Sequence, residues 1–149
     1  MTYLVRWPID QQSLIRRVAA PDRGGIACFL GTVRNHHTNR EVRRLSYTAY
    51  EPMAEAECQR LLDEAKTRWP VAMALEHRLG DLAIGDVAVA VVAAAAHREP
   101  AFEACRYVMD QLKHRVPIWK REHYGDGSVA WVDPTGAQAP GPPAEVTHG

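Results

Sequence analysis

The stretch VAVAVVAAAA, from Val87 to Ala96, decides the fold of this chain. Every residue in it is apolar, so both faces of a strand built from it would be buried, as happens in the centre of a sheet. Its alanine-rich second half would suit a helix equally well. The β-branched valines and the turn-forming pair Gly85-Asp86 just before it favour a strand. We therefore predict a central strand here.

The segments around this strand predict three helices and several more strands. Asp10 can cap the first helix, Pro52 opens the second at its first turn, and Gly31 indicates a bulge or a close backbone approach within a strand. Because helices and strands mix without regular alternation, the class is α+β, a single domain with an antiparallel or mixed sheet flanked by helices. The expected helices cover 10–19, 53–69 and 100–116, and the other strands cover 26–33, 45–50, 71–79, 118–123 and 128–132.

Three details of this scheme concern burial. Residues 80–86 are expected to be a plain connection between two strands, and the alternating strand that begins at Leu45 is expected to be half-buried. Phe102 is expected to face the core, at the start of the apolar stripe of the third helix. The cysteines are odd in number, widely spaced and without a CxxC pair, so we expect each to pack as a small core hydrophobe and not in a disulfide or zinc site: Cys28, Cys58 and Cys105.

The length and the two ends of the chain predict its organisation. With 149 residues, the chain fits one domain, which we place at 1–133. Residues 134–149, PTGAQAPGPPAEVTHG, are rich in Pro, Gly and Ala and predict a flexible tail. The first residues, MTYLVRWPID, lack the apolar stretch of a secretory signal, and no apolar run approaches the roughly 20 residues of a membrane span. We expect a cytoplasmic protein.

The charges balance to zero but are unevenly distributed. Basic residues concentrate in two segments, RNHHTNREVRR at 34–44 and KHRVPIWKREH at 113–123. A nonspecific binder of nucleic acid or membranes usually carries net positive charge, so local basic segments in a neutral protein indicate a site for a small anion. We expect neither nucleic acid nor membrane as a partner.

Two lysines in the second basic segment are candidates for catalysis. Lys113 lies near the end of the third predicted helix and Lys120 lies in the next strand, beyond the break at Pro117. A chain reversal at Pro117 would bring both amines into one pocket, where repulsion and burial would lower their pKa values and let a lysine act as acid, base or nucleophile. The alternative is two solvated surface charges.

Two further clusters are candidates for binding an anion. His97 and Arg98 stand at the start of the third helix, whose N-terminus favours an anion, although the pair taken alone favours a solvated turn. Arg34, after the strand 26–33, offers a planar fork for a carboxylate or phosphate. The neighbouring His36-His37 pair is a poor metal site because adjacent residues rarely face one ion. We predict no metal and no cofactor.

Four motifs in this order resemble the MoaE family, the large catalytic subunit of molybdopterin synthase. The resemblance covers about residues 26–132 and is much more specific than any single motif. It implies an α/β-hammerhead-like fold and a sulfurtransferase of molybdenum cofactor biosynthesis. The motifs are FLGTVRNHH at 29–37, LSYTAYEPMAE at 45–55, AAHREPAFEA at 95–104 and LKHRVPIWKRE at 112–122.

The resemblance also implies a reaction and partners. In this family a small ubiquitin-like subunit inserts its C-terminal Gly-Gly tail, activated as a thiocarboxylate, beside cyclic pyranopterin monophosphate. Two sulfur transfers then make the dithiolene of molybdopterin. The large subunits form a homodimer with one small subunit at each far end, giving a heterotetramer. Since the thiocarboxylate carries its own nucleophilic sulfur, no cofactor is implied.

Matching the motifs position by position implies the site residues. Lys120 and Lys113 correspond to the family's essential lysines, and our hypothesis makes Lys120 the acid/base or acyl-accepting group. The remaining matched positions are implied to bind the substrate: Thr32, Val33, Arg34, His97, Arg98, Arg121 and Glu122. Two other functions stay open from the residues alone, namely a noncatalytic phosphate- or nucleotide-binding module and a lysine-dependent Schiff-base enzyme.

Overall fold

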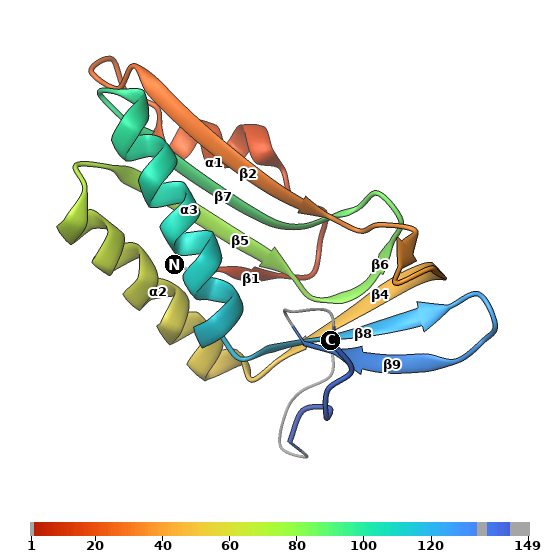
Figure 1. Ribbon diagram of the computed structural model, residues 1–149. Coiled ribbons are helices and arrows are strands. Elements are labelled where there is room, and N and C mark those ends of the chain that lie inside the picture. Colours follow the sequence, from red (N-terminus) through yellow and green to blue (C-terminus); the bar gives the residue numbers. More distant parts are fainter. Residues whose placement is uncertain (1, 134–136, 144–149) are drawn as a thin grey trace.

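The structure is a computed structural model that describes residues 2–133 and 137–143. These residues form three helices and two sheets (Figure 1). The helices are α1 (Gln11–Val18), α2 (Glu51–Arg68) and α3 (Arg98–Arg115). The strands are β1 (Leu4–Val5), β2 (Gly25–Thr32), β3 (His36–His37), β4 (Arg40–Ala49), β5 (Ala72–Arg78), β6 (Gly80–Ala83), β7 (Val87–Ala95), β8 (Ile118–Tyr124) and β9 (Val129–Val132).

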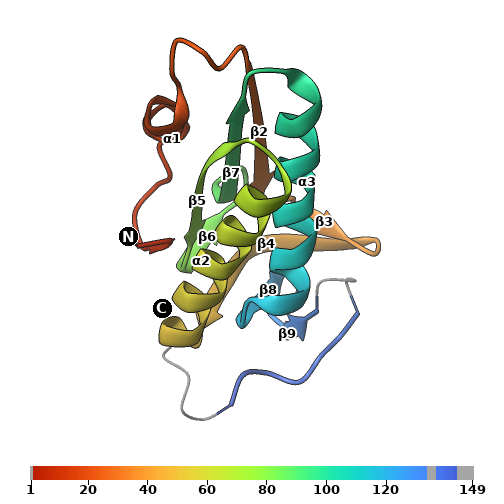
Figure 2. The ribbon, with the colours of Figure 1, turned by 90° about the vertical axis from the view of Figure 1, so that its left-hand side faces the viewer.

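The first sheet has the strand order β1-β5-β7-β2. Strand β7 lies between β5 and β2 and is antiparallel to both, and its residues from Ala88 to Ala95 are all buried. Helices α2 and α3 cover one face of this sheet and α1 covers the other (Figure 2). This arrangement explains why both faces of β7 are apolar, and it confirms the predicted central strand and the α+β class.

The second sheet is built on the long strand β4. Strand β8 runs antiparallel to β4 and pairs with β9, while β3 and β6 also pair with β4. In Figure 1 this sheet lies at the lower right, beyond the C-terminal end of α3. Since α3 leads directly into β8, the end of the helix lies where the two sheets meet.

Several local predictions are confirmed with their physical causes. Asp10 caps α1 by accepting hydrogen bonds from the backbone N–H groups of Gln12 and Ser13. The register of β2 against β7 shifts between Gly31 and Thr32, which is the predicted irregularity. A Cβ atom at position 31 would lie 2.8 Å from Cγ1 of Val89, so the close approach of the strands requires glycine there.

Other predictions were wrong because the tertiary surroundings decided burial. The connection 80–86 contains strand β6, which adds to β4. Strand β4 is not half-buried: Ser46 and Thr48 on its supposed outer face are also buried. Phe102 is 63% exposed although it lies at the predicted core spacing, and Cys28 is exposed on β2. The short strands β1 and β3 were not predicted, because two residues carry too little pattern.

The predicted tail is described only in part. Gln138 forms an antiparallel bridge with Val132, and the backbone N–H of Ala139 donates to the carbonyl oxygen of Trp131. Residues 134–136 and 144–149 lie outside the described residues, so the flexible tail stays a prediction. Within the described ranges, no helix is long and apolar enough to cross a membrane.

Candidate active site

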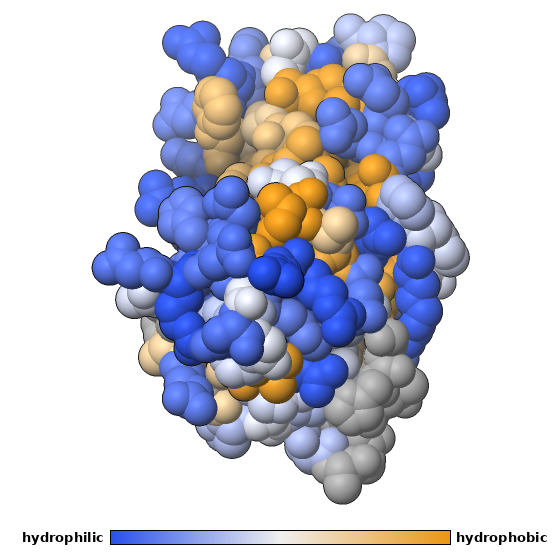
Figure 3. All heavy atoms as spheres, turned by 90° about the vertical axis from the view of Figure 1, so that its right-hand side faces the viewer, coloured by the Kyte–Doolittle hydropathy of each residue, from blue (hydrophilic) through white to orange (hydrophobic). Residues whose placement is uncertain are grey.

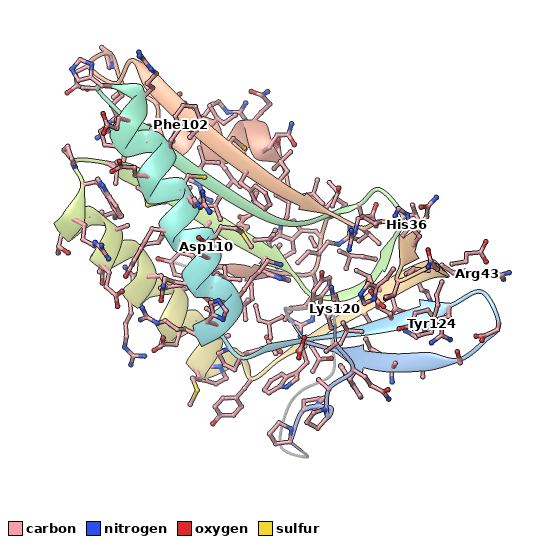
Figure 4. All side chains as sticks on the ribbon, in the orientation of Figure 1. His36, Arg43, Phe102, Asp110, Lys120 and Tyr124 are labelled. Atoms are coloured by element: carbon pink, nitrogen blue, oxygen red, sulfur yellow. The ribbon has the colours of Figure 1, made fainter. Side chains whose placement is uncertain are left out.

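A cavity of about 300 Å³ opens where the two sheets meet the end of α3. In Figure 4 Lys120 lies between the sheets, at the opposite end of α3 from Phe102. Seen from the right of Figure 1, hydrophilic side chains gather in the lower half of the surface, and apolar ones lie above them (Figure 3). The polar side chains that line the cavity are Thr32, Arg34, His36, Tyr47, His77, Lys113, Lys120, Glu122 and Asp133.

The two predicted lysines reach this cavity from successive elements. Lys113 lies in the last turn of α3 and is exposed, whereas Lys120 lies on β8, opposite Tyr47 of β4, and is partly buried. Helix α3 ends at Arg115 with Val116 as its C-cap, and Pro117 leads directly into β8. The reversal that the sequence predicted at Pro117 therefore brings both amines to one cavity.

The pKa of Lys120 lies below that of an ordinary lysine. Burial is the main cause, because removing an ammonium group from water disfavours its charged form. The positive charges of Lys113 and Arg34 act in the same direction, and the carboxylate of Glu122 opposes them. The cavity therefore holds an amine that releases its proton more readily than a lysine in water, which suits acid–base or nucleophilic chemistry.

This lowered pKa predicts that Lys120 destabilises the fold. The unfolded chain binds the proton of Lys120 more tightly than the folded chain does, so the buried ammonium group lowers the free energy of unfolding. This loss is complete at pH values below the pKa of Lys120 in the folded chain. It disappears as the pH rises toward the pKa of Lys120 in the unfolded chain. Lys120→Met is expected to raise the free energy of unfolding at neutral pH, with a gain that shrinks at alkaline pH. Urea denaturation at several pH values measures this, and Lys66→Met, at an exposed position of α2, is the control. A gain independent of pH would contradict the electrostatic cause.

Glu122 is a buried acid in the wall of the cavity. Its Oε1 lies 2.7 Å from Nδ1 of His37, and it accepts a hydrogen bond of 2.9 Å from the hydroxyl of Tyr124. Arg40 stacks on the ring of Tyr124, with its guanidinium carbon 3.6 Å from the ring centroid. The carboxylate is therefore held from its outer side while its charge acts on Lys120 in the cavity.

His77 and Tyr47 form an uncharged part of the wall. Their rings meet edge to face at 4.8 Å. Burial lowers the pKa of His77 to about 4, and Nδ1 of the ring lies 2.9 Å from the carbonyl oxygen of Arg78. Burial also raises the pKa of Tyr47 to about 12. Both groups are neutral near pH 7, so they shape the cavity without adding charge.

Sequence reasoning missed these two residues, although a signal for each was present. His77 follows Met73 and Leu75 on the same buried face of β5, and a polar residue in such a place needs a partner or a role. Tyr47 follows Leu45 on the same face of β4, and Leu45 also lines the cavity. Neither signal identifies the cavity without the pairing of β4 with β8, which only the fold supplies.

Of the other residues that the family resemblance implies for substrate binding, some line the cavity and others lie outside it. Thr32, Arg34 and Glu122 line it. The side chain of Val33 packs instead in the core beneath the second sheet. Arg121 alternates with Lys120 along β8 and so faces the other side of that sheet, where its guanidinium carbon lies 5.3 Å from the ring centroid of Trp131.

His97 and Arg98 lie at the other end of α3 from the lysines. His97 is the N-cap of this 18-residue helix and Arg98 is its first residue. A helix rises about 1.5 Å per residue, so Arg98 and Lys113, which are 15 positions apart, are separated by more than about 20 Å along the helix. Within one copy of the chain, these two residues therefore do not join the lysine cavity.

The cavity is thus a cationic pocket suited to a small anion. Arg34, Lys113 and Lys120 supply positive charge, and the neutral rings supply shape. The described residues contain no group of three or more His, Cys, Asp or Glu side chains that could hold a metal ion. The chemistry that these residues can perform is electrostatic stabilisation and proton transfer.

Comparisons with known proteins agree with each other. The family model described as MoaE protein matches residues 4–115. The molybdopterin synthase catalytic subunit of Pyrococcus abyssi is 42% identical over 133 residues, covering 87% of this chain and 89% of that protein. The same subunit of Thermoplasma volcanium is 44% identical over 124 residues, covering 83% of this chain and 90% of that protein.

Solved structures give the same result. Molybdopterin synthase from Staphylococcus aureus superposes with a TM-score of 0.84 and 32% identity, covering 87% of this chain and 95% of that chain. A complex of subunits 1 and 2 of molybdopterin-converting factor from Helicobacter pylori contains a chain with a TM-score of 0.70 and 25% identity, covering 84% of this chain and 86% of that chain.

Proposed function

This chain belongs to the MoaE family, the catalytic subunits of molybdopterin synthase, and we propose that its lysine cavity is where the sulfur is transferred. The sulfur donor is the thiocarboxylated C-terminal Gly-Gly tail of a small ubiquitin-like subunit, and the acceptor is cyclic pyranopterin monophosphate. The Helicobacter pylori complex of two subunits supports a partner of this kind. The free cysteines of the chain are compatible with the reducing cytoplasm, which we propose as its location.

The observation that carries this proposal is the meeting of Lys113, Lys120 and Arg34 in one cavity. The phosphate of the pterin and the thiocarboxylate of the tail are both anions, and each needs a cationic partner when water is excluded. A buried amine with a lowered pKa can then exchange a proton with the reacting groups. Noncatalytic phosphate binding needs the cations but not such an amine.

The chain's own residues have separate parts in this proposal. Lys120 is the acid/base or transient acyl-accepting group, and Lys113 at the rim holds the incoming tail. Thr32 and Arg34 bind the pterin phosphate, and Glu122 tunes Lys120 by its charge. For Val33 and Arg121 we propose only an indirect part, because their side chains pack away from the cavity.

A homodimer gives His97 and Arg98 a place in the same proposal. In the described part of the chain, β2 is an edge strand of the first sheet. Two of its apolar side chains, Ile26 and Phe29, are exposed, at 42% and 43%. Phe102 on the neighbouring helix adds a third exposed apolar side chain. An edge strand with such side chains is suited to pairing with a second copy of itself.

Antiparallel pairing of two β2 strands would place the N-terminal end of each strand beside the C-terminal end of the other. The N-terminal end of β2 lies against the start of α3, because a Cβ atom at Gly25 would lie 3.1 Å from the Cα of Arg98. The C-terminal end of β2 carries Thr32 into the cavity. In such a dimer, His97 and Arg98 of one copy would approach the lysine cavity of the other.

A mixing experiment tests this arrangement. Arg98→Ala and Lys120→Ala are each expected to be inactive alone, but co-expression of the two is expected to restore activity, because one cavity of each mixed dimer is intact. Co-expressed Lys113→Ala and Lys120→Ala is the matched control and is expected to stay inactive, since every cavity then lacks a lysine. Equal restoration in both mixtures, or none in either, would contradict the shared site.

The proposed function itself is tested by reconstitution. The chain is incubated with a thiocarboxylated small subunit and cyclic pyranopterin monophosphate, and the dithiolene product is measured. Product is expected only with the thiocarboxylate form of the partner. Binding of generic phosphates without any product would support the noncatalytic module instead.

A further inference from the structure

A side-chain network links the lysine cavity to the β3–β4 hairpin on the surface. Glu122 has only 5% of its side chain exposed, and it contacts His37, whose side chain is 18% exposed. The contact is short, with 2.7 Å between His37 Nδ1 and Glu122 Oε1. The imidazole therefore lies between a buried acid of the cavity and the solvent.

The hairpin fixes the position of His37. His37 pairs with Arg40 across a two-residue turn, in which Thr38 and Asn39 have positive φ values of 51° and 63°. This is the turn geometry that matches the twist of two antiparallel strands, and a β-branched residue such as Thr38 adopts it unfavourably. The chain thus keeps a strained turn at the point that directs His37 toward Glu122.

The charged and titratable groups around this network come from several parts of the chain. Those that line the cavity are Lys120 of β8, Lys113 of α3, Tyr47 of β4, His77 of β5, His36 of β3, Arg34 and Asp133, and of these the charges of Lys113, Arg34 and Asp133 act on Lys120. On the outer side are Tyr124 of β8 and Arg40 of β4, which stacks on it. His37 and Tyr124 converge on the same oxygen of Glu122, so loss of either contact changes the environment of the carboxylate.

We propose that His37 is a positioning residue that holds the Glu122 carboxylate beside Lys120 and carries protons between Glu122 and the solvent. The inference rests on the proposed sulfur transfer and assigns a part to a residue outside the lysine cavity. A lysine that has taken up a proton in one transfer must lose it before the next. The proton passes from the Lys120 ammonium to the Glu122 carboxylate, and from there to Nδ1 of a neutral His37 ring that carries its own proton on Nε2. The Nε2 proton then leaves to water, and proton exchange with water returns the ring to its first tautomer before the next transfer. One proton moves outward, and no oxidant or reductant takes part.

Three variants separate this relay from a purely structural contact. His37→Ala removes the imidazole, and the turnover number is expected to fall about 10- to 100-fold, as for the hydrogen-bond partners of metal ligands, while KM for the pterin stays unchanged. Added imidazole in the buffer is expected to restore part of the rate. His37→Asn keeps a hydrogen-bond donor for Glu122 but cannot carry a proton, so it is expected to be slow, with an altered pH profile. His114→Asn, at an exposed position of α3, is expected to behave as wild type.

The outcomes distinguish the two levels of the proposal. If the wild-type protein makes product but His37→Asn keeps its turnover number and pH profile, the relay is overturned and His37 is only a structural contact. Failure of imidazole to restore His37→Ala also overturns it. If the wild-type protein makes no product at all, the proposed function fails, and the relay fails with it.

Discussion

Lys120→Ala is expected to lower the turnover number by at least about 100-fold, because positioned acid–base groups contribute roughly 10²–10⁴-fold to a rate. Lys120 is the most buried cation of the cavity and the one whose pKa is lowered by its surroundings. Among the described residues of the cavity the other amine is Lys113, which lies at the exposed rim and is not expected to replace Lys120. Single-turnover measurement of the dithiolene product gives the rate without interference from product release.

Lys120→Arg is the informative companion to this variant. It keeps a positive charge in the cavity but replaces the amine with a guanidinium, which stays protonated in proteins. If Lys120 only holds an anion, Lys120→Arg is expected to retain much of the rate. Loss of activity in both variants supports the acid/base or acyl-accepting part, and near-normal turnover of Lys120→Ala would rule it out.

Leu75→Ala is expected to lower the free energy of unfolding by about 2–5 kcal/mol, the usual cost of a leucine truncated in a packed core. Leu75 is fully buried on β5, in the cluster formed by the first sheet with α2 and α3. The loss includes the transfer energy of the removed atoms and the cavity that they leave. Urea denaturation monitored by circular dichroism measures it.

Ile84→Ala is the control for this prediction. Ile84 is an exposed aliphatic residue in the turn after β6, so its truncation is expected to change the free energy of unfolding by less than about 0.5 kcal/mol. Equal losses in the two variants would mean that the core described around β5 does not dominate stability.

The central part of the fold could be predicted from the sequence because its helices and strands have long, consistent patterns of apolar residues. Strand β7 is apolar at every position, and the helix that became α2 carries its stripe from Ala54 to Ala65. Strand β6 was not predicted because it has only four residues that pair with β4, and the glycines and aspartates in and around it indicate a turn. Phe102 was wrongly predicted to be buried, because helical spacing does not show whether another helix or strand covers that position.

Only part of the candidate site could be predicted from the sequence, because some of its residues meet through contacts between distant segments. The lysines lie seven residues apart around one chain reversal, so local geometry alone predicts their meeting. Tyr47 joins them through the pairing of β4 with β8, and His77 joins them through its ring contact with Tyr47; no local pattern reveals either contact. His97 and Arg98 were named from their place at a helix start and again from the family's motifs, but a single copy keeps them apart from the lysines.

Transfer of labelled sulfur tests the central claim most directly. The small subunit is prepared with a ³⁵S-labelled thiocarboxylate, and the label is followed into the pterin in the presence of the wild-type chain or Lys120→Ala. We expect that both dithiolene sulfurs of the product carry the label with the wild-type chain, and that transfer nearly disappears with the variant. Unlabelled product, or transfer at an equal rate by the variant, would contradict it.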